Sequence, residues 1–407
     1  MAVGEATWPA TMHAISGVRL GVAQAGVKYA GRNDLLVIAI EEGASVAGVF
    51  TQSAFAAAPV LIARDHIANG DIRYLIVNSG NANACTGERG MGDARATCRA
   101  LAELAEVKPH QVIPFSTGVI GEYLPTDKII AAIPQALAAA SEDNWALAGR
   151  TIMTTDTRPK GASVQFEFDG EIVSVTGIAK GAGMIRPNMA TMLAYIATDA
   201  VCAPHVLETI VKKTADKSFN RITIDGDTST NDACILIASG QAGLPMLTST
   251  HGELYEKLLA AVTDVQQQLA QAIVKDGEGA TKFVAVRVEQ GTNSHECLQI
   301  AYAIAHSPLI KTALYASDPN WGRIVAAIGY AGVKNLDARL VSVWLDDVLI
   351  VADGGRAASY TEQAGAAVVS KAEFAIRVAL GRGDVQEQVW TCDLSHEYVT
   401  INAEYRS

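Results

Sequence analysis

The stretch Lys180-Gly-Ala-Gly-Met-Ile-Arg-Pro-Asn-Met-Ala-Thr191-Met-Leu-Ala-Tyr-Ile-Ala-Thr198 joins a glycine-rich loop to an apolar run. The apolar run predicts a buried strand, and Thr191 stands at the junction between loop and strand. A loop can expose a hydroxyl group that the strand holds rigidly, which suits a threonine nucleophile. The ordinary alternative is a β-branched residue that opens a strand.

A threonine inside a chain is a weak nucleophile, because its hydroxyl needs an adjacent base. If the chain is cut just before Thr191, the new α-amino group supplies that base. Its reference pKa of about 8 leaves a usable neutral fraction near pH 7. The junction is therefore compatible with a nucleophile that is made by cleavage.

Composition limits the possible functions. The 407 residues predict two or three domains with a large core. Hydrophobic residues make up 49% and charged residues 18%, which is not the composition of a disordered chain. The formal net charge is −11 without any block of Lys or Arg, so no nucleic-acid partner is expected. No apolar run is long enough to cross a bilayer, and the first Lys or Arg is Arg19, so we expect no membrane association, no signal peptide and a cytoplasmic protein.

The sequence contains little evidence for a metal site or for a cysteine nucleophile. The six cysteines are scattered and form no CxxC pair, so neither a zinc site nor a disulfide framework is predicted. Cys85 is a candidate thiol nucleophile in a polar loop, but no histidine lies close to it in sequence. The run from Asp225 to Asp232 has alternating oxygen donors like a calcium loop, but it lacks the Gly and Glu that such a loop requires. A hydrogen-bonded turn is the alternative there.

Nucleotide motifs are also weak. The chain has no GxxxxGK[ST] sequence, and Arg186 stands where a GxGxxG motif starting at Gly181 needs its third glycine. Arg89-Gly-Met-Gly-Asp-Ala94 fits the RxxGxA pattern of one acetyl-CoA-dependent acetyltransferase fold, and chance is the alternative in a chain rich in Gly and Ala. Thr117-Gly118 follows a predicted strand. A glycine lets the backbone approach a substrate and a hydroxyl adds a donor, so this pair suits an oxyanion hole; a simple turn is the alternative.

The mixture of hairpins and helices predicts α+β layers rather than regular βαβ winding. Strands are expected at 35–40, 45–50, 73–78, 111–115, 163–168, 171–178, 282–289, 341–345, 348–351, 372–380, 389–392 and 398–403. Helices are expected at 94–107, 126–140, 204–216, 253–275, 297–316 and 324–330. The first two strands are expected to pair with each other, and Asp169-Gly170 is expected to form a two-residue hairpin turn.

Several segments together resemble the ornithine acetyltransferase family, also called glutamate N-acetyltransferase or arginine biosynthesis bifunctional protein. They are the stretch that begins at Lys180, Asn78-Ser-Gly-Asn-Ala-Asn-Ala, Ser116-Thr-Gly-Val-Ile-Gly-Glu, Met153-Thr-Thr-Asp-Thr, Asp276-Gly-Glu-Gly-Ala-Thr-Lys-Phe, Asp318-Pro-Asn-Trp-Gly-Arg and Ile401-Asn-Ala-Glu-Tyr-Arg-Ser407. The resemblance covers essentially the whole chain. It departs at Ser407, where many members have Thr, and either residue supplies a hydroxyl.

The resemblance implies an acetyltransferase of cyclic arginine biosynthesis that moves the acetyl group of N-acetylornithine to glutamate through an acetyl-Thr191 intermediate. It implies a layered α/β/β/α sandwich of the self-processing N-terminal-nucleophile type, with a smaller C-terminal α/β domain. Cleavage between Ala190 and Thr191 would give an α chain (1–190) and a β chain (191–407), with a sub-domain boundary near 282–290. Two α and two β chains would form a heterotetramer.

The resemblance also assigns the site residues. Thr191 is the nucleophile, and Thr117 and Gly118 form the oxyanion hole. The substrate-binding positions are Thr154, Lys180, Thr191, Glu278, Asn402 and Ser407. No cofactor or metal is implied. Lys180 suits a substrate carboxylate and Glu278 an ammonium group; a solvated lysine, a surface charge and a frayed tail are the ordinary alternatives for such residues.

Three other functions stay open at the level of sequence. An N-terminal threonine ester could react with water, which would make the protein a hydrolase. Acetyl-CoA could serve as a further acetyl donor for glutamate, as in some members of the family. A ligand-binding protein without activity is the third alternative, which the intact nucleophile and pocket positions disfavour.

Overall fold

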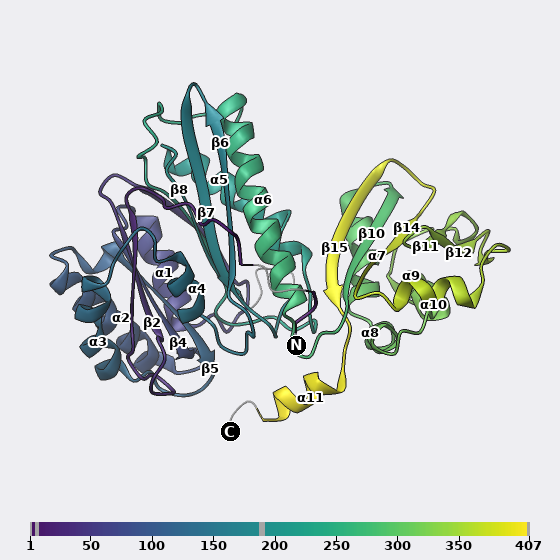
Figure 1. Ribbon diagram of the computed structural model, residues 1–407, viewed down its shortest axis with the longest axis horizontal. Helices are drawn as coiled ribbons and strands as arrows, with labels where there is room; N and C mark the ends of the chain where they lie inside the picture. Colours follow the sequence, from purple (N-terminus) through teal and green to yellow (C-terminus); the bar gives the residue numbers. More distant parts are fainter. Residues whose placement is uncertain (1, 5–7, 187–191, 405–407) are drawn as a thin grey trace. The chain divides into compact units, whose positions relative to one another are not determined.

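The computed structural model describes residues 2–4, 8–186 and 192–404, and it divides them into two compact units (Figure 1). Of these residues, the larger unit contains 8–186, 192–220 and 228–273, and the smaller unit contains 2–4, 221–227 and 274–404. The chain leaves the larger unit at Val274, before the range 282–290 where a sub-domain boundary is predicted.

The larger unit contains a four-stranded sheet with the order β1-β2-β4-β5. Its strands are β1 (Val18–Ala23), β2 (Leu35–Ile40), β4 (Tyr74–Asn81) and β5 (Val112–Val119). The β4–β5 pair is parallel and the other pairs are antiparallel. Strands β4 and β5 therefore end at the same edge, where Gly80 lies opposite Gly118.

A second sheet of the same unit has the order β3-β9-β8-β7-β6. Its strands are β3 (Ser45–Phe50), β6 (Lys160–Phe168), β7 (Glu171–Lys180), β8 (Leu193–Thr198) and β9 (Ala233–Ala238). Strand β8 is antiparallel to β7, with Lys180 opposite Leu193, and parallel to β9. The predicted hairpin is confirmed: Asp169 and Gly170 both have positive φ angles between β6 and β7.

The two sheets face each other across one hydrophobic core. Side chains from every second position of both sheets meet in it, and the rings of Phe115 and Tyr195 make an edge contact at 5.4 Å between centroids. Strand β8 is buried along its whole length, as the apolar run after Thr191 predicts. Helices α1 (Ala58–Asn69) and α4 (Trp145–Thr151) add side chains to this core.

Helices cover the outer faces of both sheets (Figure 1). Helices α2 (Gly87–Leu104) and α3 (Thr126–Ala138) pack on the four-stranded sheet through a second core. Helices α5 (Pro204–Asp216) and α6 (Glu253–Lys275) cover the five-stranded sheet. A side chain at Gly177 of β7 would meet Val265 and Leu269 of α6 at 3.2 Å. The α/β/β/α order of layers is therefore confirmed.

The smaller unit is an α/β domain, as expected. Its six-stranded sheet has the order β13-β12-β11-β14-β10-β15. The strands are β10 (Phe283–Gly291), β11 (Ser342–Leu345), β12 (Val348–Ala352), β13 (Gly355–Arg356), β14 (Glu373–Ala379) and β15 (Val385–Cys392). Helices α7 (Ser294–Ala305), α8 (Pro308–Tyr315), α9 (Trp321–Tyr330) and α10 (Glu362–Val369) pack on one face of it.

Three expectations about elements are wrong. Strands β2 and β3 do not pair, because each belongs to a different sheet. Residues 398–403 lie in a helix, α11 (His396–Ala403), whose N-cap Ser395 accepts a hydrogen bond from the Tyr398 amide at 3.4 Å. The helix expected at 297–316 is two helices, because Ser307 caps a new helix that begins at Pro308. The elements that were not expected are strands β1, β9 and β13 and helices α1, α4 and α10.

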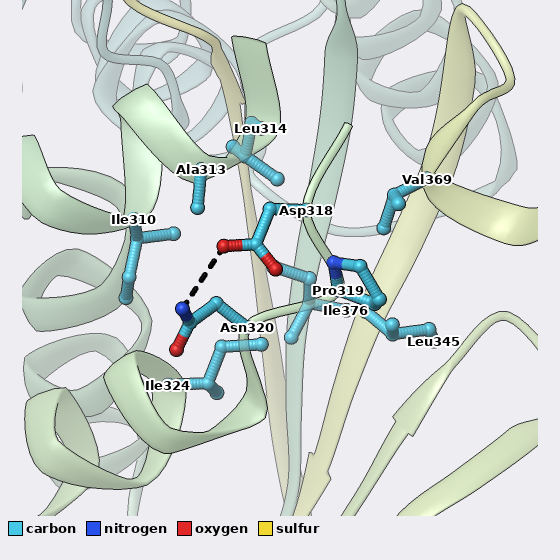
Figure 2. Close-up of a pocket in the computed structure, with 10 residues that line it drawn as sticks. All are labelled: Ile310, Ala313, Leu314, Asp318, Pro319, Asn320, Ile324, Leu345, Val369 and Ile376. Atoms are coloured by element: carbon cyan, nitrogen blue, oxygen red, sulfur yellow. Dashed lines mark hydrogen bonds between the residues drawn. The ribbon is translucent and has the colours of Figure 1, made fainter. Parts of the chain in front are cut away.

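The segment from Asp318 to Asn320, part of the family resemblance, has a structural role at the start of α9. The Asn320 side chain accepts from the Arg323 amide at 3.2 Å and donates to Asp318 at 3.0 Å (Figure 2). The surrounding cavity, lined mainly by apolar side chains, has a volume of about 10 Å³, which is room for roughly one water molecule. In the described part of the chain, no helix is both long and apolar enough to cross a membrane.

Candidate functional site

A buried lysine joins the two sheets of the larger unit. Lys180 is the last residue of β7, and Thr117 lies near the end of β5 in the opposite sheet. The Lys180 Nζ donates a hydrogen bond to Thr117 Oγ1 at 3.0 Å, and both residues are buried. A buried ammonium group is expensive to desolvate, so a hydrogen-bonded lysine inside a sandwich indicates a polar site there.

Gly118 lies where two backbones approach each other closely. Its φ angle is +137°, and a Cβ atom at this position would lie 2.2 Å from the carbonyl carbon of Gly80. A side chain would therefore collide with backbone rather than with another side chain. The strand pair is also irregular beside this contact, at Gly80 and Asn81. A glycine is required at position 118.

Buried amide side chains fix the turns around Gly118. Asn78 accepts a hydrogen bond from the Ser116 hydroxyl at 2.6 Å and donates to the Asn81 carbonyl at 2.8 Å. Asn231, just before β9, donates to the carbonyls of Ala82 at 2.6 Å and Ser116 at 2.9 Å. These bonds tie the ends of β4 and β5 to the start of β9, which makes the Thr117-Gly118 segment rigid.

Asp156 anchors the loop that carries Thr154. Its Oδ2 accepts from the Thr154 amide at 3.0 Å, and its Oδ1 accepts from the Gly181 amide at 2.7 Å and from Lys160 Nζ at 2.6 Å. Burial would raise the pKa of Asp156, but the ammonium groups of Lys160 and Lys180 and these hydrogen bonds hold that pKa far below the ordinary carboxyl range. The carboxylate is therefore ionised at neutral pH.

Asp232 is a second buried carboxyl group near Lys180. Within residues 2–4, 8–186 and 192–404, neither of its side-chain oxygen atoms accepts a hydrogen bond that meets the ordinary limits of distance and angle. Burial raises the pKa of Asp232 well above its ordinary value, against the opposing effects of Lys180, the Met192 amide and the Ser229 hydroxyl. The two carboxyl groups close to Lys180 therefore differ in their affinity for a proton.

Two predicted binding residues meet in the smaller unit. The Asn402 side chain, on α11, donates to Glu278 Oε2 at 2.8 Å, and Glu278 is buried. Tyr398, one turn earlier, donates from its hydroxyl to Asp225 at 3.2 Å. Burial, together with the Asp225 carboxylate, raises the pKa of Tyr398 above its usual range. This cluster is acidic, so it suits a cationic group.

The structure thus brings Thr117, Gly118 and Lys180 together, links Thr154 to them through Asp156, and pairs Glu278 with Asn402. Ala190, Thr191 and Ser407 lie outside the described residues. The roles given to all these residues stay predictions. The sequence reasoning assigned no individual role to Asp156, Asn231 or Asp232, although Asn231 and Asp232 stand in the run from Asp225 to Asp232 for which a hydrogen-bonded turn was an alternative. Asp156 stands in the quoted segment Met153-Thr-Thr-Asp-Thr, but one sequence offers no local sign that its carboxylate holds Gly181.

Other candidates have ordinary structural positions. Arg89–Ala94 lies inside α2, which begins at Gly87, so it is not the loop before a helix that the RxxGxA pattern needs; most amides inside a helix are already hydrogen-bonded. Arg89 contacts the Tyr123 ring instead, at 3.8 Å from the centroid. Cys85 is exposed, with a positive φ angle. In the described part of the chain, no group of three or more His, Cys, Asp or Glu side chains is placed to hold a metal ion.

Comparison with known proteins identifies the family. The model of the ArgJ family matches residues 19–407. The arginine biosynthesis bifunctional protein ArgJ of Pseudomonas syringae pv. tomato is 59% identical over 407 residues, which is 100% of both chains. The protein of the same name from Pseudomonas fluorescens is 58% identical, again over 100% of both chains.

Solved structures of two relatives also match parts of the chain. The arginine biosynthesis bifunctional protein ArgJ of Bacillus halodurans is 35% identical, with 50% of this chain and 95% of that chain covered and a TM-score of 0.48. The ornithine acetyltransferase of Mycobacterium tuberculosis, solved in complex with ornithine, is 33% identical, with 42% and 92% covered and a TM-score of 0.36. The family model and the full-length relatives are decisive: this chain belongs to the ArgJ family.

Proposed function

We propose that this protein is an acyltransferase that moves the acetyl group of N-acetylornithine to glutamate, with Thr191 as the acetyl carrier. Its relatives of 58–59% identity are named for arginine biosynthesis. The observation that carries the proposal is the hydrogen bond from Lys180 to Thr117. A hydroxyl has one donor and two acceptor positions, so accepting from Lys180 leaves the Thr117 proton to donate to a substrate oxygen.

The charges of two predicted binding residues, Lys180 and Glu278, suit the two substrates. N-acetylornithine and glutamate both carry an α-carboxylate, and the buried Lys180 ammonium is the matching cation in the larger unit. N-acetylornithine also carries a side-chain ammonium, and the Glu278 carboxylate, which accepts a hydrogen bond from Asn402, has the charge that suits such a group. Charge-assisted hydrogen bonds of this kind are roughly twice as strong as neutral ones.

The first half-reaction forms the acetyl-enzyme. The Thr191 hydroxyl oxygen attacks the acetyl carbonyl carbon while the Thr191 α-amino group takes the hydroxyl proton. Thr117 and Gly118 stabilise the negative charge that develops on the carbonyl oxygen. The carbon–nitrogen bond then breaks, the α-ammonium returns its proton to the departing nitrogen, and ornithine leaves. An acetyl ester remains on Thr191.

The second half-reaction reverses this chemistry with another amine. The amino group of glutamate attacks the ester carbonyl, the ester bond breaks, and a proton passes from the attacking nitrogen to the Thr191 oxygen. The products are N-acetylglutamate and the free enzyme. An acyl bond is exchanged for an acyl bond, so the scheme needs neither a nucleotide nor a cofactor, and its kinetics are ping-pong.

The same hydroxyl makes the active form. In the precursor, the Thr191 hydroxyl attacks the Ala190 carbonyl carbon, the peptide carbon–nitrogen bond breaks as its nitrogen takes the hydroxyl proton, and water then hydrolyses the resulting ester. This releases the carboxyl group of residue 190 and the α-amino group of Thr191. The loop that leads there starts from a fixed point, because Asp156 holds the Gly181 amide.

Intact mass spectrometry tests this function. We expect two polypeptides, 1–190 and 191–407, and after mixing with N-acetylornithine the second should be heavier by one acetyl group. Addition of glutamate should remove the acetyl group and yield N-acetylglutamate. An uncut chain that still transfers acetyl groups would exclude the scheme. Equal ornithine release with and without glutamate would identify a hydrolase instead.

A second activity is favoured by the word bifunctional in the names of both relatives. We propose that acetyl-CoA can also load Thr191, so that glutamate is acetylated directly. A thiol assay for free coenzyme A checks this, with glutamate present and absent. Glutamate-dependent thiol release by the cut enzyme supports the second activity, and its absence limits the enzyme to N-acetylornithine.

The assembly and the location belong to the same proposal. We expect two copies of each polypeptide in one particle, and native mass spectrometry should then report a heterotetramer. A cytoplasmic location is expected for an enzyme whose substrates are free amino acids, and cell fractionation would check it.

A further inference from the structure

Asp156 accepts hydrogen bonds from three separate parts of the larger unit. The donors are the Thr154 amide in its own loop, Lys160 Nζ at the start of β6, and the Gly181 amide just after β7. The side chains of Asp156 and Lys160 are almost completely buried. A carboxylate with so many donors holds them in a fixed arrangement, because each loses a strong partner if it moves.

The three donors connect the predicted substrate contacts. Thr154 is one of the predicted substrate-binding residues, and Gly181 follows another of them, Lys180, directly in the chain. Lys180 in turn reaches across to Thr117 in the opposite sheet. The Asp156 carboxylate therefore fixes two neighbours of the Lys180 side chain. One is the loop that carries Thr154, and the other is the backbone next to Lys180 itself.

The charge of Asp156 also acts on Lys180 directly. The ammonium groups of Lys160 and Lys180 both lower the pKa of Asp156, and by reciprocity its negative charge stabilises both ammonium groups. The charge of Asp232 also interacts with Lys180. Neither Asp156 nor Asp232 has a role in the acetyl-transfer scheme given above.

We propose that Asp156 is a positioning residue of the transferase: its anion holds Lys180 and Thr154 where they receive the substrate, and keeps Lys180 charged. The inference rests on the proposed function of this site. In this role Asp156 acts through Lys180, Thr154 and the backbone at Gly181 rather than on the reacting atoms.

The test is Asp156→Asn, which keeps the shape and removes the charge. An amide nitrogen then faces donors that need an acceptor, so the Gly181 backbone or the Thr154 loop must move. A displacement of about 1 Å at a catalytic site lowers rates by about 100-fold. We expect kcat/KM to fall by about 100-fold for both N-acetylornithine and glutamate, because both substrates use the same lysine.

The pH profile separates positioning from a purely structural role. Removal of a neighbouring anion lowers the pKa of Lys180, because the ammonium form loses a favourable interaction. The alkaline limb of the kcat/KM profile should therefore move to lower pH in Asp156→Asn. Asp232 and Lys160 remain in the variant, so the shift reports the loss of one charge. If Asp156→Asn only made the protein less stable, the alkaline limb of the kcat/KM profile would stay at the same pH.

Two variants serve as controls. Asp346 in the smaller unit also accepts from a lysine, Lys371 Nζ at 2.7 Å, and from a backbone amide, Ala375 at 2.8 Å, but it is remote in sequence from the predicted site residues. Asp346→Asn should change kcat/KM by less than about threefold, within the effect of a surface ion pair. Lys160→Gln still donates to Asp156 and keeps its anion, so it should stay within about tenfold of the wild type.

All variants are assayed as folded protein at a temperature below the onset of their melting curves. A wild-type-like kcat/KM and pH profile in folded Asp156→Asn would overturn the inference. Equal losses of kcat/KM in Asp156→Asn and Lys160→Gln would also overturn it, because the effect would then belong to the Asp156–Lys160 ion pair. If Asp156→Asn does not fold, Lys160→Gln decides: retained turnover supports the inference and lost turnover rejects it. Failure of the proposed function is recognised separately, because the wild type would then neither be cut nor take up an acetyl group.

Discussion

Replacement of Thr191 by alanine is expected to leave one uncut chain of 42.8 kDa and to abolish acetyl transfer. The alanine has no hydroxyl to attack either the Ala190 carbonyl or the acetyl donor, so both reactions lose their nucleophile. Loss of a nucleophile that acts together with its base can cost about 10⁶-fold in kcat. A denaturing gel and a glutamate-dependent assay measure the two effects.

Two further variants sharpen this experiment. Thr191→Ser keeps a hydroxyl and should still be cut, which shows that the chemistry rather than the residue's bulk is needed. Thr126→Ala removes a threonine at the start of α3, away from the predicted nucleophile in sequence, and should be cut and active like the wild type. Two bands from Thr191→Ala, in the absence of contaminating protease, would refute the assignment of the nucleophile.

Gly118→Ala is expected to have the second-largest effect. The added Cβ would lie 2.2 Å from the Gly80 carbonyl carbon and 2.5 Å from the Asn81 nitrogen, so the backbones of β4 and β5 must separate. The φ angle of +137° adds strain for any residue with a side chain. Displacement of an oxyanion-hole donor costs about 3 kcal/mol, or more than 100-fold in kcat.

Gly121→Ala is the matched control for this experiment. Gly121 lies three residues later and also has a positive φ angle, +86°, but a Cβ there meets no atom within 4 Å. It therefore carries the strain of a positive φ angle without the collision, and should lower the melting temperature while leaving kcat close to that of the wild type. Equal loss of kcat in both variants would show that strain, rather than the position of the donor, limits the reaction.

The sequence predicted those parts of the fold that depend on local chemistry. The Asp169-Gly170 turn is one, because two positive φ angles are needed there and these residues tolerate them. Helix α5 is another, with Pro204 in its first turn and an amphipathic pattern up to Asp216. In both cases, adjacent residues decide the structure, so one sequence is sufficient.

Pairing between distant segments could not be predicted in the same way. Strand β2 pairs with β1 and β4, while β3 pairs with β9, which follows it by more than 180 residues. The short connection between β2 and β3 looks like a hairpin, but the chain uses it to pass from one sheet to the other. The β6–β7 hairpin was predicted, and it brings Asp156, before β6, and Gly181, after β7, to the same open end, but the sequence does not show that the carboxylate accepts from the Gly181 amide.

The order of strands in the five-stranded sheet has a consequence for how the enzyme can be made. Strands β3, β6 and β7 precede residue 190, whereas β8 and β9 follow residue 191 and lie between β3 and β7. A gene divided at codon 191 would encode one product without the centre of this sheet and another without its flanks. We therefore expect the sheet to form from one continuous chain, with the proposed cut between Ala190 and Thr191 following the formation of the sheet.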